Sequence, residues 1–233
     1  SFKDFYRDCA VELKESIFGK MYEFNTQPNM IFELLPQWKN NEDYVASFSK
    51  KYRDQYKRAR KKADGIEKRQ LNLHEIITLE ARIYELYLHV AENAPFNTFF
   101  LAKNHFRCLK EKMGDAFRFF AYFEQGQLIG FNTLFQHDVL LETYFLGYDP
   151  KVQKEKMLYL NMLYNMTEFG IENQFKKIIF GRTALEIKSS IGAKPVIMSG
   201  FIYHTNKWIN RILPKIFPNL EPSLVWQQRH PFK

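Results

Sequence analysis

The chain has 233 residues, of which 45% are hydrophobic and 17% aromatic, so it can bury the core of one large domain and is not intrinsically disordered. Its net charge of +8 favours partners that carry phosphate, such as a nucleotide cofactor, tRNA or anionic lipid, although an ordinary basic protein has the same balance. Two cysteines, Cys9 and Cys108, exclude a disulfide framework and a zinc–cysteine site. No secretory leader opens the chain and no apolar run reaches the roughly 18 residues of a membrane span, so we expect a cytoplasmic protein.

The first forty residues predict one helix and one strand. Apolar side chains recur at helical spacing over residues 2–18, and Gly19 is typical of a helix end. Residues 30–35 are an apolar run and predict a strand. This stretch is too short for a domain. We therefore expect residues 1–40 to be the remnant of an upstream half and residues 41–233 to form the main domain.

A strongly basic helix is expected over residues 41–63, because apolar residues at helical spacing mark one of its faces. The other face carries a dense set of cations: Lys50, Lys51, Arg53, Lys57, Arg58, Arg60, Lys61 and Lys62. Like charges this close repel one another unless a ligand neutralises them, which indicates a track for a phosphate-rich ligand. The solvated face of an ordinary surface helix is the alternative.

The middle of the chain alternates between strands and helices. We expect a strand over 66–71 and two helices, the first over 74–92 and the second from Thr98 to Met113. Three strands joined by short turns then predict an antiparallel meander, over 116–124, 128–136 and 139–146.

Residues 143–188 predict a strand, a helix and a second strand. Asp149 is expected to cap the helix and Pro150 to be its first residue, with Gly170 as its end. A buried strand over 177–180 and a short helix over 184–190 follow. Such a crossover forces parallel pairing of its two strands.

In sheets of this kind, ligands bind at the carboxyl ends of the strands. Those ends are expected here at Leu146–Tyr148 and Phe180–Arg182. A strand over 196–204 and a helix over 208–213 close the chain. The order of elements predicts an α/β (α+β) fold with a mixed sheet flanked by helices.

Three segments occur in an informative order: Phe48–Arg53 with the basic helix and Asp64–Ile66, the hairpin Gly126–Gly130 running into Tyr144–Pro150, and Ile179–Lys188 followed by Gly192–Pro195 and His204. Together they resemble the GNAT acyltransferases, and more narrowly the divergent branch that includes the Fem-type peptidoglycan aminoacyltransferases and related N-acyltransferases. The resemblance implies a GNAT-like, mostly antiparallel twisted sheet. It also implies transfer of an acyl group from acyl-CoA, or of an aminoacyl group from tRNA, to an amine on a small molecule, a cell-wall component or a lipid.

The resemblance also implies a place for the donor. The donor would run along the strand at Phe145, Leu146 and Gly147, and its pyrophosphate would sit at the N-terminus of the next helix, where free backbone N–H groups favour an anion. Three lysines would add charge: Lys151, Lys154 and Lys156. The family's Gln/Arg-x-x-Gly-x-Gly/Ala loop is absent from this chain, and this departure keeps donors other than acetyl-CoA open.

Attack of an amine on an ester or thioester requires a neutral amine, a polarised carbonyl and a proton for the leaving group. Glu186 is the candidate base, and the alternative for it is an ion pair with Arg182 four residues earlier. Tyr148 is the candidate proton donor, or equally a core aromatic. Arg182, Lys188 and His204 are candidates to contact the acceptor. We expect no metal.

Three functions stay open at this point. The first is an acyl-CoA-type N-acyltransferase, and the second is a Fem-like transferase in which the basic helix holds aminoacyl-tRNA. The third is a catalytically silent module that binds nucleic acid or a protein partner. The glycines of a nucleophile elbow and of a phosphate-binding loop are missing, which argues against a serine hydrolase and a P-loop enzyme.

Overall fold

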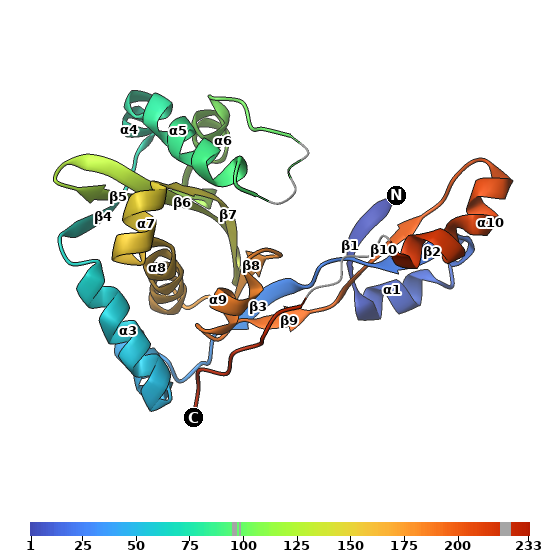
Figure 1. Cartoon of the computed structure of the whole chain (residues 1–233), viewed down its shortest axis with the longest axis horizontal. Coiled ribbons are helices and arrows are strands. Elements are labelled where there is room, and N and C mark those ends of the chain that lie inside the picture. The colour runs from blue at the N-terminus through green and yellow to red at the C-terminus, as the bar shows by residue number, and fades with distance from the viewer. Residues whose placement is uncertain (95–96, 98, 220–224) are drawn as a thin grey trace.

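Two sheets organise the molecule, a seven-stranded sheet in a rounded lobe and a three-stranded sheet in an arm that projects from it (Figure 1). The computed structural model describes residues 1–94, 97, 99–219 and 225–233. Within these residues no helix is both long enough and apolar enough to span a bilayer.

The lobe sheet has the strand order β4-β5-β6-β7-β8-β3-β9. Its strands are β3 (Asn29–Glu33), β4 (Ile66–Gln70), β5 (Phe117–Glu124), β6 (Gln127–His137), β7 (Leu140–Tyr148), β8 (Lys177–Gly181) and β9 (Lys194–Val196). Among these strands only β7 and β8 pair in parallel, and every other pair is antiparallel. The predicted meander and the predicted parallel crossover are both confirmed.

Helices cover both faces of the lobe sheet, and each face has its own core. The lobe helices are α2 (Asn41–Ser47), α3 (Lys50–Lys62), α4 (Leu73–Thr78), α5 (Glu80–Ala91), α6 (His105–Met113), α7 (Pro150–Lys156), α8 (Leu158–Glu172) and α9 (Leu185–Ser189), with a 3₁₀ turn η2 (Gly114–Ala116). Strand β5 shows the alternation that divides the cores. Phe120 and Tyr122 pack with α2, α3 and α8, whereas Phe119 and Ala121 pack with α5 and α6.

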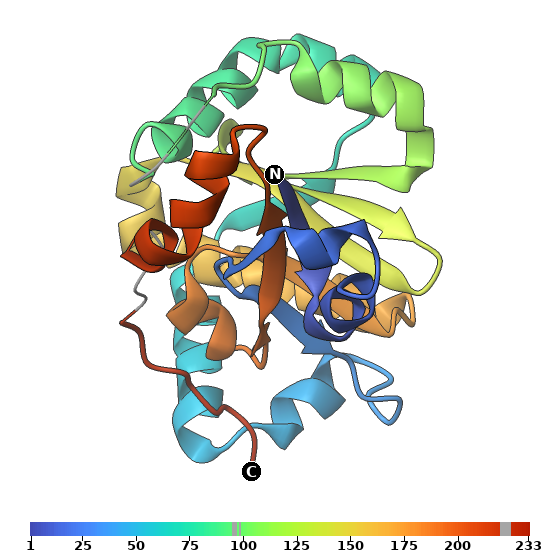
Figure 2. The same ribbon diagram turned by 90° about the vertical axis from the view of Figure 1, so that its right-hand side faces the viewer.

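The prediction of one helix over residues 2–18 is wrong, because this segment begins with a strand of the arm and only Arg7–Leu13 is an α-helix. The sheet of the arm has the order β1-β10-β2 and is antiparallel throughout, with β1 (Phe2–Tyr6), β2 (Tyr22–Asn25) and β10 (Met198–Ile202). The arm also holds α1 (Arg7–Leu13), α10 (Lys207–Ile216) and the 3₁₀ turns η1 (Ile17–Lys20) and η3 (Phe217–Asn219). Phe2 and Phe5 lie in a strand because their rings pack on Phe18, and Phe5 also packs on Phe201 of β10. In Figure 2, where the arm faces the viewer, α1 and α10 lie on opposite sides of this sheet.

The predicted strand over 196–204 is wrong in one respect, because it is two strands. β9 pairs with β3 in the lobe, whereas β10 pairs with β1 and β2 in the arm. Ile197 separates them, so this segment carries the chain from one sheet to the other. The β2–β3 connection makes the same crossing near Thr26, whose N–H donates to Met198 O at 3.0 Å.

The crossover helix after β7 also differs from its prediction. Asp149 caps it and Pro150 opens it as expected, but Met157 adopts a left-handed conformation (φ 52°) and divides α7 from α8. The helix does not end at Gly170, because this residue is packed beneath Ile178 of β8 and α8 continues to Glu172. A side chain at this position would collide with the sheet, so the glycine allows close packing here.

Two other predicted helices are each divided in two. The segment over 41–63 separates into α2 and α3 around Phe48 and Ser49, and the segment over 74–92 separates into α4 and α5 at Leu79. The helix expected to begin at Thr98 begins at His105 instead, and Thr98 itself lies outside the described residues.

Candidate active site

The central feature of the candidate site is the separation of β7 from β8. The two strands pair only at Leu140–Glu142, whereas β6 accompanies β7 as far as Tyr148. β8 continues to Gly181, held on its other side by β3. Within the described chain, the β7 edge from Thr143 to Tyr148 therefore has no strand partner on the β8 side. The three donor residues predicted on the strand, Phe145, Leu146 and Gly147, lie along this edge.

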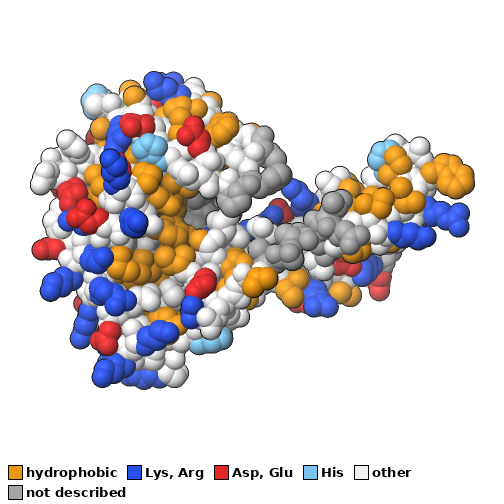
Figure 3. Space-filling model, viewed as in Figure 1, with side chains coloured by type: hydrophobic (Ala, Val, Ile, Leu, Met, Phe, Trp, Pro, Cys, Tyr) orange, Lys and Arg blue, Asp and Glu red, His pale blue; other side chains and the backbone are white. Residues whose placement is uncertain are grey.

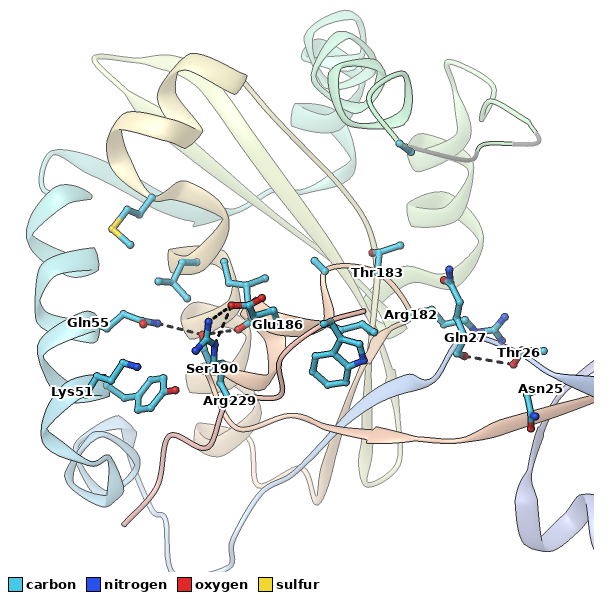
Figure 4. A pocket seen from close by; sticks show the side chains of 18 of the residues that line it. Asn25, Thr26, Gln27, Lys51, Gln55, Arg182, Thr183, Glu186, Ser190 and Arg229 are labelled. Atoms are coloured by element: carbon cyan, nitrogen blue, oxygen red, sulfur yellow. Dashed lines mark hydrogen bonds and ion pairs between the residues drawn. The ribbon is translucent and has the colours of Figure 1, made fainter. Parts of the chain in front are cut away.

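A cavity of about 1330 Å³ lies beyond the carboxyl end of β8 (Figure 4). The lobe contributes α3, the junction of α7 and α8, the β8–α9 loop with α9, and Ala94 after α5, whereas the arm contributes Lys3, Phe217 and the β2–β3 connection. The C-terminal segment contributes Trp226 and Arg229. The site thus lies where the carboxyl end of a sheet strand, the arm and the end of the chain meet.

The β8–α9 loop owes its shape to two residues in the left-handed region. Gly181 (φ 77°) ends β8, and Ala184 (φ 53°) precedes the first turn of α9. The two reversals place Arg182 and Thr183 in the cavity wall, followed by Glu186 on α9. A non-glycine residue in this region is uncommon, so Ala184 marks a position held by its surroundings.

Glu186 and Arg182 both line the cavity, but they do not form the ion pair considered as their alternative role. Arg229 donates through Nε to Glu186 Oε1 at 3.0 Å, and its NH2 contacts the same oxygen (Figure 4). Arg182 instead pairs with Asp4 of β1. The structure therefore brings the candidate base and one candidate acceptor contact to one cavity and gives each a partner from a distant part of the chain.

Lys188 lies beneath this wall rather than in it. Its side chain is buried and Nζ donates to the carbonyl oxygen of Phe180, the penultimate residue of β8, at 2.5 Å. Burial without a carboxylate partner lowers the pKa of Lys188 to about 7. Lys188 therefore binds the C-terminal end of β8 through this hydrogen bond.

Tyr148 and His204, the remaining candidates for catalysis and acceptor contact, lie outside the described cavity lining. Tyr148 is half-buried beside Tyr159, with ring centroids 6.2 Å apart, and burial raises the pKa of its hydroxyl. His204 is exposed in the arm, where its Nδ1 accepts a hydrogen bond from the Asn206 N–H at 3.0 Å.

The predicted donor residues surround a helix start that already holds a carboxylate. Asp149 accepts from the N–H of Lys151 at 2.9 Å, and its other oxygen lies 3.7 Å from Arg82. Lys156 pairs with Glu124 at 2.9 Å, whereas Lys151 and Lys154 are exposed. A diphosphate at this helix start would compete with Asp149 for the same N–H group.

The donor residues on β7 are held from one side by α5. A Cβ on Gly147 would lie 2.5 Å from the carbonyl carbon of Leu86, and Phe145 packs edge-on against Tyr87 with centroids 5.7 Å apart. Leu146, between them, is partly exposed. Contact with α5 thus fixes the course of β7 as it leaves β8.

Sequence reasoning missed several residues of the cavity wall. Gln55 of α3 donates to Ser190 Oγ at 3.3 Å across the cavity base. Trp226 and Arg229 reach the cavity because the C-terminal segment lies along α9, with the Arg229 N–H donating to Ser189 Oγ at 2.8 Å. No local pattern marks these residues, since their role depends on contacts between distant segments. Within the described ranges, no three His, Cys, Asp or Glu side chains gather as metal ligands would.

Comparisons with known proteins show the fold. No protein-family model and no curated protein sequence matches this chain. FemX matches with a TM-score of 0.60 at 11% identity over 91% of this chain and 72% of that one. L-PGS from Bacillus licheniformis matches with 0.57 at 11% identity over 91% and 70% of the two chains. The C-terminal domain of a putative lysylphosphatidylglycerol synthetase from Agrobacterium fabrum matches with a TM-score of 0.56 at 7% identity over 91% of this chain and 71% of that one.

Identities this low show architecture alone. The chain has a GNAT-like fold, with a mixed, mostly antiparallel twisted sheet flanked by helices, as the sequence resemblance predicted.

Proposed function

We propose that this protein is an N-acyltransferase whose reaction takes place in the cavity at the carboxyl end of β8. The observation that carries the proposal is the separation of β7 from β8, together with the β8–α9 loop that lines the cavity. It leaves a strand edge whose backbone groups can pair with an extended donor, as unpaired edges do. The GNAT-like fold of the chain supports the same conclusion.

The residues of the cavity suit the chemistry of amide formation. The acceptor amine attacks the donor carbonyl, a C–N bond forms, and the C–O or C–S bond to the leaving group breaks. One proton leaves the amine and one is taken up by the leaving group. Glu186 is the carboxylate that lines the cavity, and we assign it the removal of the amine proton. Arg229 holds that carboxylate in place.

The charge of the cavity favours a donor or acceptor that carries phosphate. Three cations in its wall, Lys3, Lys51 and Arg58, form no ion pair with a carboxylate in the described chain, whereas Arg182 and Arg229 do. The wall therefore carries a surplus of positive charge in a partly enclosed space, where charge interactions are stronger than in bulk water.

Among the donors, aminoacyl-tRNA suits the structure better than acyl-CoA. α3 contributes Lys51 and Arg58 to the cavity and continues outward with Lys57, Lys61 and Lys62, forming a track from the cavity onto the lobe surface. Figure 3 shows basic side chains gathered along this side of the lobe. α7 lies against α3 and adds two exposed lysines, Lys151 and Lys154. The Fem-type resemblance of the sequence implies the same donor.

Binding of aminoacylated tRNA tests the donor. We expect retention of tRNA at low salt and an affinity that falls steeply as salt rises, because bound cations of the RNA are released. Lys57→Glu with Lys61→Glu should weaken binding by about tenfold or more. The matched control, Lys103→Glu with Lys112→Glu, makes the same charge change near α6 and should bind as the unaltered protein does. Equal loss in both variants would show nonspecific attraction.

Acyl-CoA remains the second candidate, because a separated pair of strands also suits an extended thioester donor. Calorimetry with acetyl-CoA and longer acyl-CoAs decides between them. Binding that Lys154→Glu with Lys156→Glu abolishes would favour the thioester donor at α7. Absence of any heat, together with salt-sensitive tRNA binding, would leave the tRNA donor.

The role of Glu186 is tested by transfer of a labelled amino acid from tRNA to a panel of small amines. Glu186→Gln should lower the transfer rate by about a hundredfold or more with tRNA affinity unchanged, as expected for loss of a proton acceptor. An unchanged rate would remove Glu186 from the mechanism. If the unaltered protein transferred no acyl group from any donor, a binding module would be favoured.

A further inference from the structure

The helix at the end of the arm leaves its apolar side uncovered. Trp208 is 76% exposed, Ile212 45% and Ile216 49%, and α10 has no buried residue. These three positions are four residues apart, so they form one row along the helix. Large apolar side chains exposed in a continuous row indicate an interaction surface.

A second row, next to the first, is basic. Lys207, Arg211 and Lys215 follow the same four-residue spacing, one position earlier on the helix. In the described chain none of the three forms an ion pair, and α10 itself contains no acidic residue. The helix therefore presents an apolar row bordered by unneutralised cations.

The helix is anchored so that this surface stays outward. Phe217, directly after α10, packs on Tyr22 and Phe24 of β2 with ring centroids 5.7 and 4.9 Å apart. Asn210, on another side of the helix, accepts the N–H of His204 at 3.1 Å. α10 lies at the far end of the arm, away from the lobe (Figure 1), and Figure 3 shows hydrophobic and basic side chains next to one another there.

We propose that α10 docks the protein on an anionic lipid bilayer. Trp208, Ile212 and Ile216 would enter the boundary between head groups and acyl chains, the depth that tryptophan prefers. The basic row would face the head groups, and the long Lys and Arg side chains would reach their phosphates. Charge complementarity selects this partner: a second copy of the chain would bring the same basic row against its own, which repels. The proposal is independent of the proposed transferase activity, because no residue of α10 itself lines the cavity, where only Phe217 after the helix takes part.

Vesicle flotation of the full chain tests the proposal. We expect binding to vesicles of phosphatidylcholine with about 30% phosphatidylglycerol, and little binding to phosphatidylcholine alone. Trp208→Ser with Ile212→Ser should abolish it, and Arg211→Glu with Lys215→Glu should lower the partition coefficient about tenfold or more. All four side chains are exposed, so the variants should fold, which circular dichroism verifies.

Two controls distinguish binding through α10 from nonspecific hydrophobic adsorption and from an effect of net charge. Ile77→Ser removes another exposed apolar side chain, from α4, and Lys103→Glu with Lys112→Glu repeats the double charge reversal in the lobe. Both should float as the unaltered protein does. Equal binding to neutral and anionic vesicles, equal loss in the controls, or no binding at all would overturn the proposal. So would a dimer that Trp208→Ser with Ile212→Ser dissociates, since it would show that a second copy covers α10.

Fluorescence gives an independent readout of Trp208. The difference between the spectra of the unaltered protein and Trp208→Phe isolates this residue from Trp38 and Trp226. We expect its emission to shift to shorter wavelength when anionic vesicles are added, because the indole leaves water. An unshifted spectrum in a sample that floats would show attachment through another surface.

Discussion

At the scale of single residues, Lys188 is the most unusual group in the lobe. It is 4% exposed, and its one described polar contact is the carbonyl of Phe180. An ammonium in such a place pays a desolvation cost that one neutral acceptor does not offset. Burial therefore disfavours the charged form, and with a pKa of about 7 the neutral amine of Lys188 predominates in the folded state only above pH 7.

This burial predicts a distinctive dependence of stability on pH. The pKa of Lys188 is lowered to about 7 in the folded state, so between pH 7 and the ordinary value for lysine the unfolded state binds more protons. The free energy of unfolding should then rise with pH, by up to about 1.4 kcal/mol per unit. Lys188→Met lacks this titration. Urea denaturation of both proteins from pH 6 to pH 10 should show the advantage of Lys188→Met at low pH shrinking as pH rises.

A constant difference between the two proteins would mean that Lys188 keeps its charge when folded. Lys176→Met, a change next to β8 at a position with exposed surroundings, serves as the control and should show no such trend.

At the scale of elements, the break between α7 and α8 depends on one buried amide. Asn161 Nδ2 donates to the carbonyls of Ala59 at 2.9 Å, Met157 at 3.1 Å and Lys156 at 3.3 Å. These bonds join the end of α3 to the left-handed turn at Met157, whose side chain lines the cavity. A continuous helix would leave no such turn.

Asn161→Ala should lower the free energy of unfolding by about 2 to 3 kcal/mol, because it removes three side-chain hydrogen bonds from a largely buried site. Urea denaturation at neutral pH measures this. Asn173→Ala removes an exposed amide bond to Phe169 at the end of α8 and should cost less than about 1 kcal/mol. Similar costs for the two changes would contradict a special role for Asn161.

The contact of β7 with α5 leads to a second prediction at this scale. Gly147→Ala would place a methyl group 2.5 Å from the carbonyl carbon of Leu86 and 2.6 Å from the N of Tyr87, both backbone atoms that cannot rotate away. We expect the free energy of unfolding of Gly147→Ala to be lower by about 3 kcal/mol or more. Gly65→Ala meets no atom within 4 Å and strains only its positive φ, so it should cost about 1 to 2 kcal/mol. Thermal denaturation compares the two.

At the scale of the whole molecule, the shape of the cavity depends on the position of the arm relative to the lobe. The arm contributes Lys3 and the β2–β3 connection to the wall, and Asp4 of β1 pairs with Arg182 of the lobe. The continuous segments through Thr26 and Ile197 form the two described backbone crossings. The arm should therefore behave as a fixed part of the site.

The two native cysteines allow this to be measured without new ones. Cys9 lies exposed on α1 in the arm and Cys108 lies exposed on α6 in the lobe. Spin labels on both should give a narrow distance distribution by pulsed electron resonance. Asp4→Asn should broaden it, because the ion pair with Arg182 is lost. A distribution that is broad already in the unaltered protein would contradict a fixed arm.

The parts of this fold that the sequence predicted best are those fixed by neighbours in the chain. Asp149 and Pro150 begin α7 through contacts within four residues, and the apolar run before Gly181 forms β8 as expected. Glu186 and Arg182 were expected near one another for the same reason, since α9 follows β8 directly.

The parts that escaped prediction depend on distant partners. Phe2–Tyr6 has helical spacing, yet it pairs with β10 almost the length of the chain away. The partners of Glu186 and Arg182 were likewise missed, because Arg229 and Asp4 come from opposite ends of the sequence. Local pattern carries no information on such contacts.

The contribution of Trp226 and Arg229 to the cavity has a consequence for synthesis of the protein. A nascent chain can form the meander, the crossover and α9 while it is still attached to the ribosome, because these elements precede Trp226 and Arg229 in the sequence. The wall next to Glu186 is completed only when Pro231 and Phe232 have emerged, docked on Ser49 and Phe48, and brought Arg229 into place. Prematurely terminated products would thus contain nearly the whole sheet and lack a finished site.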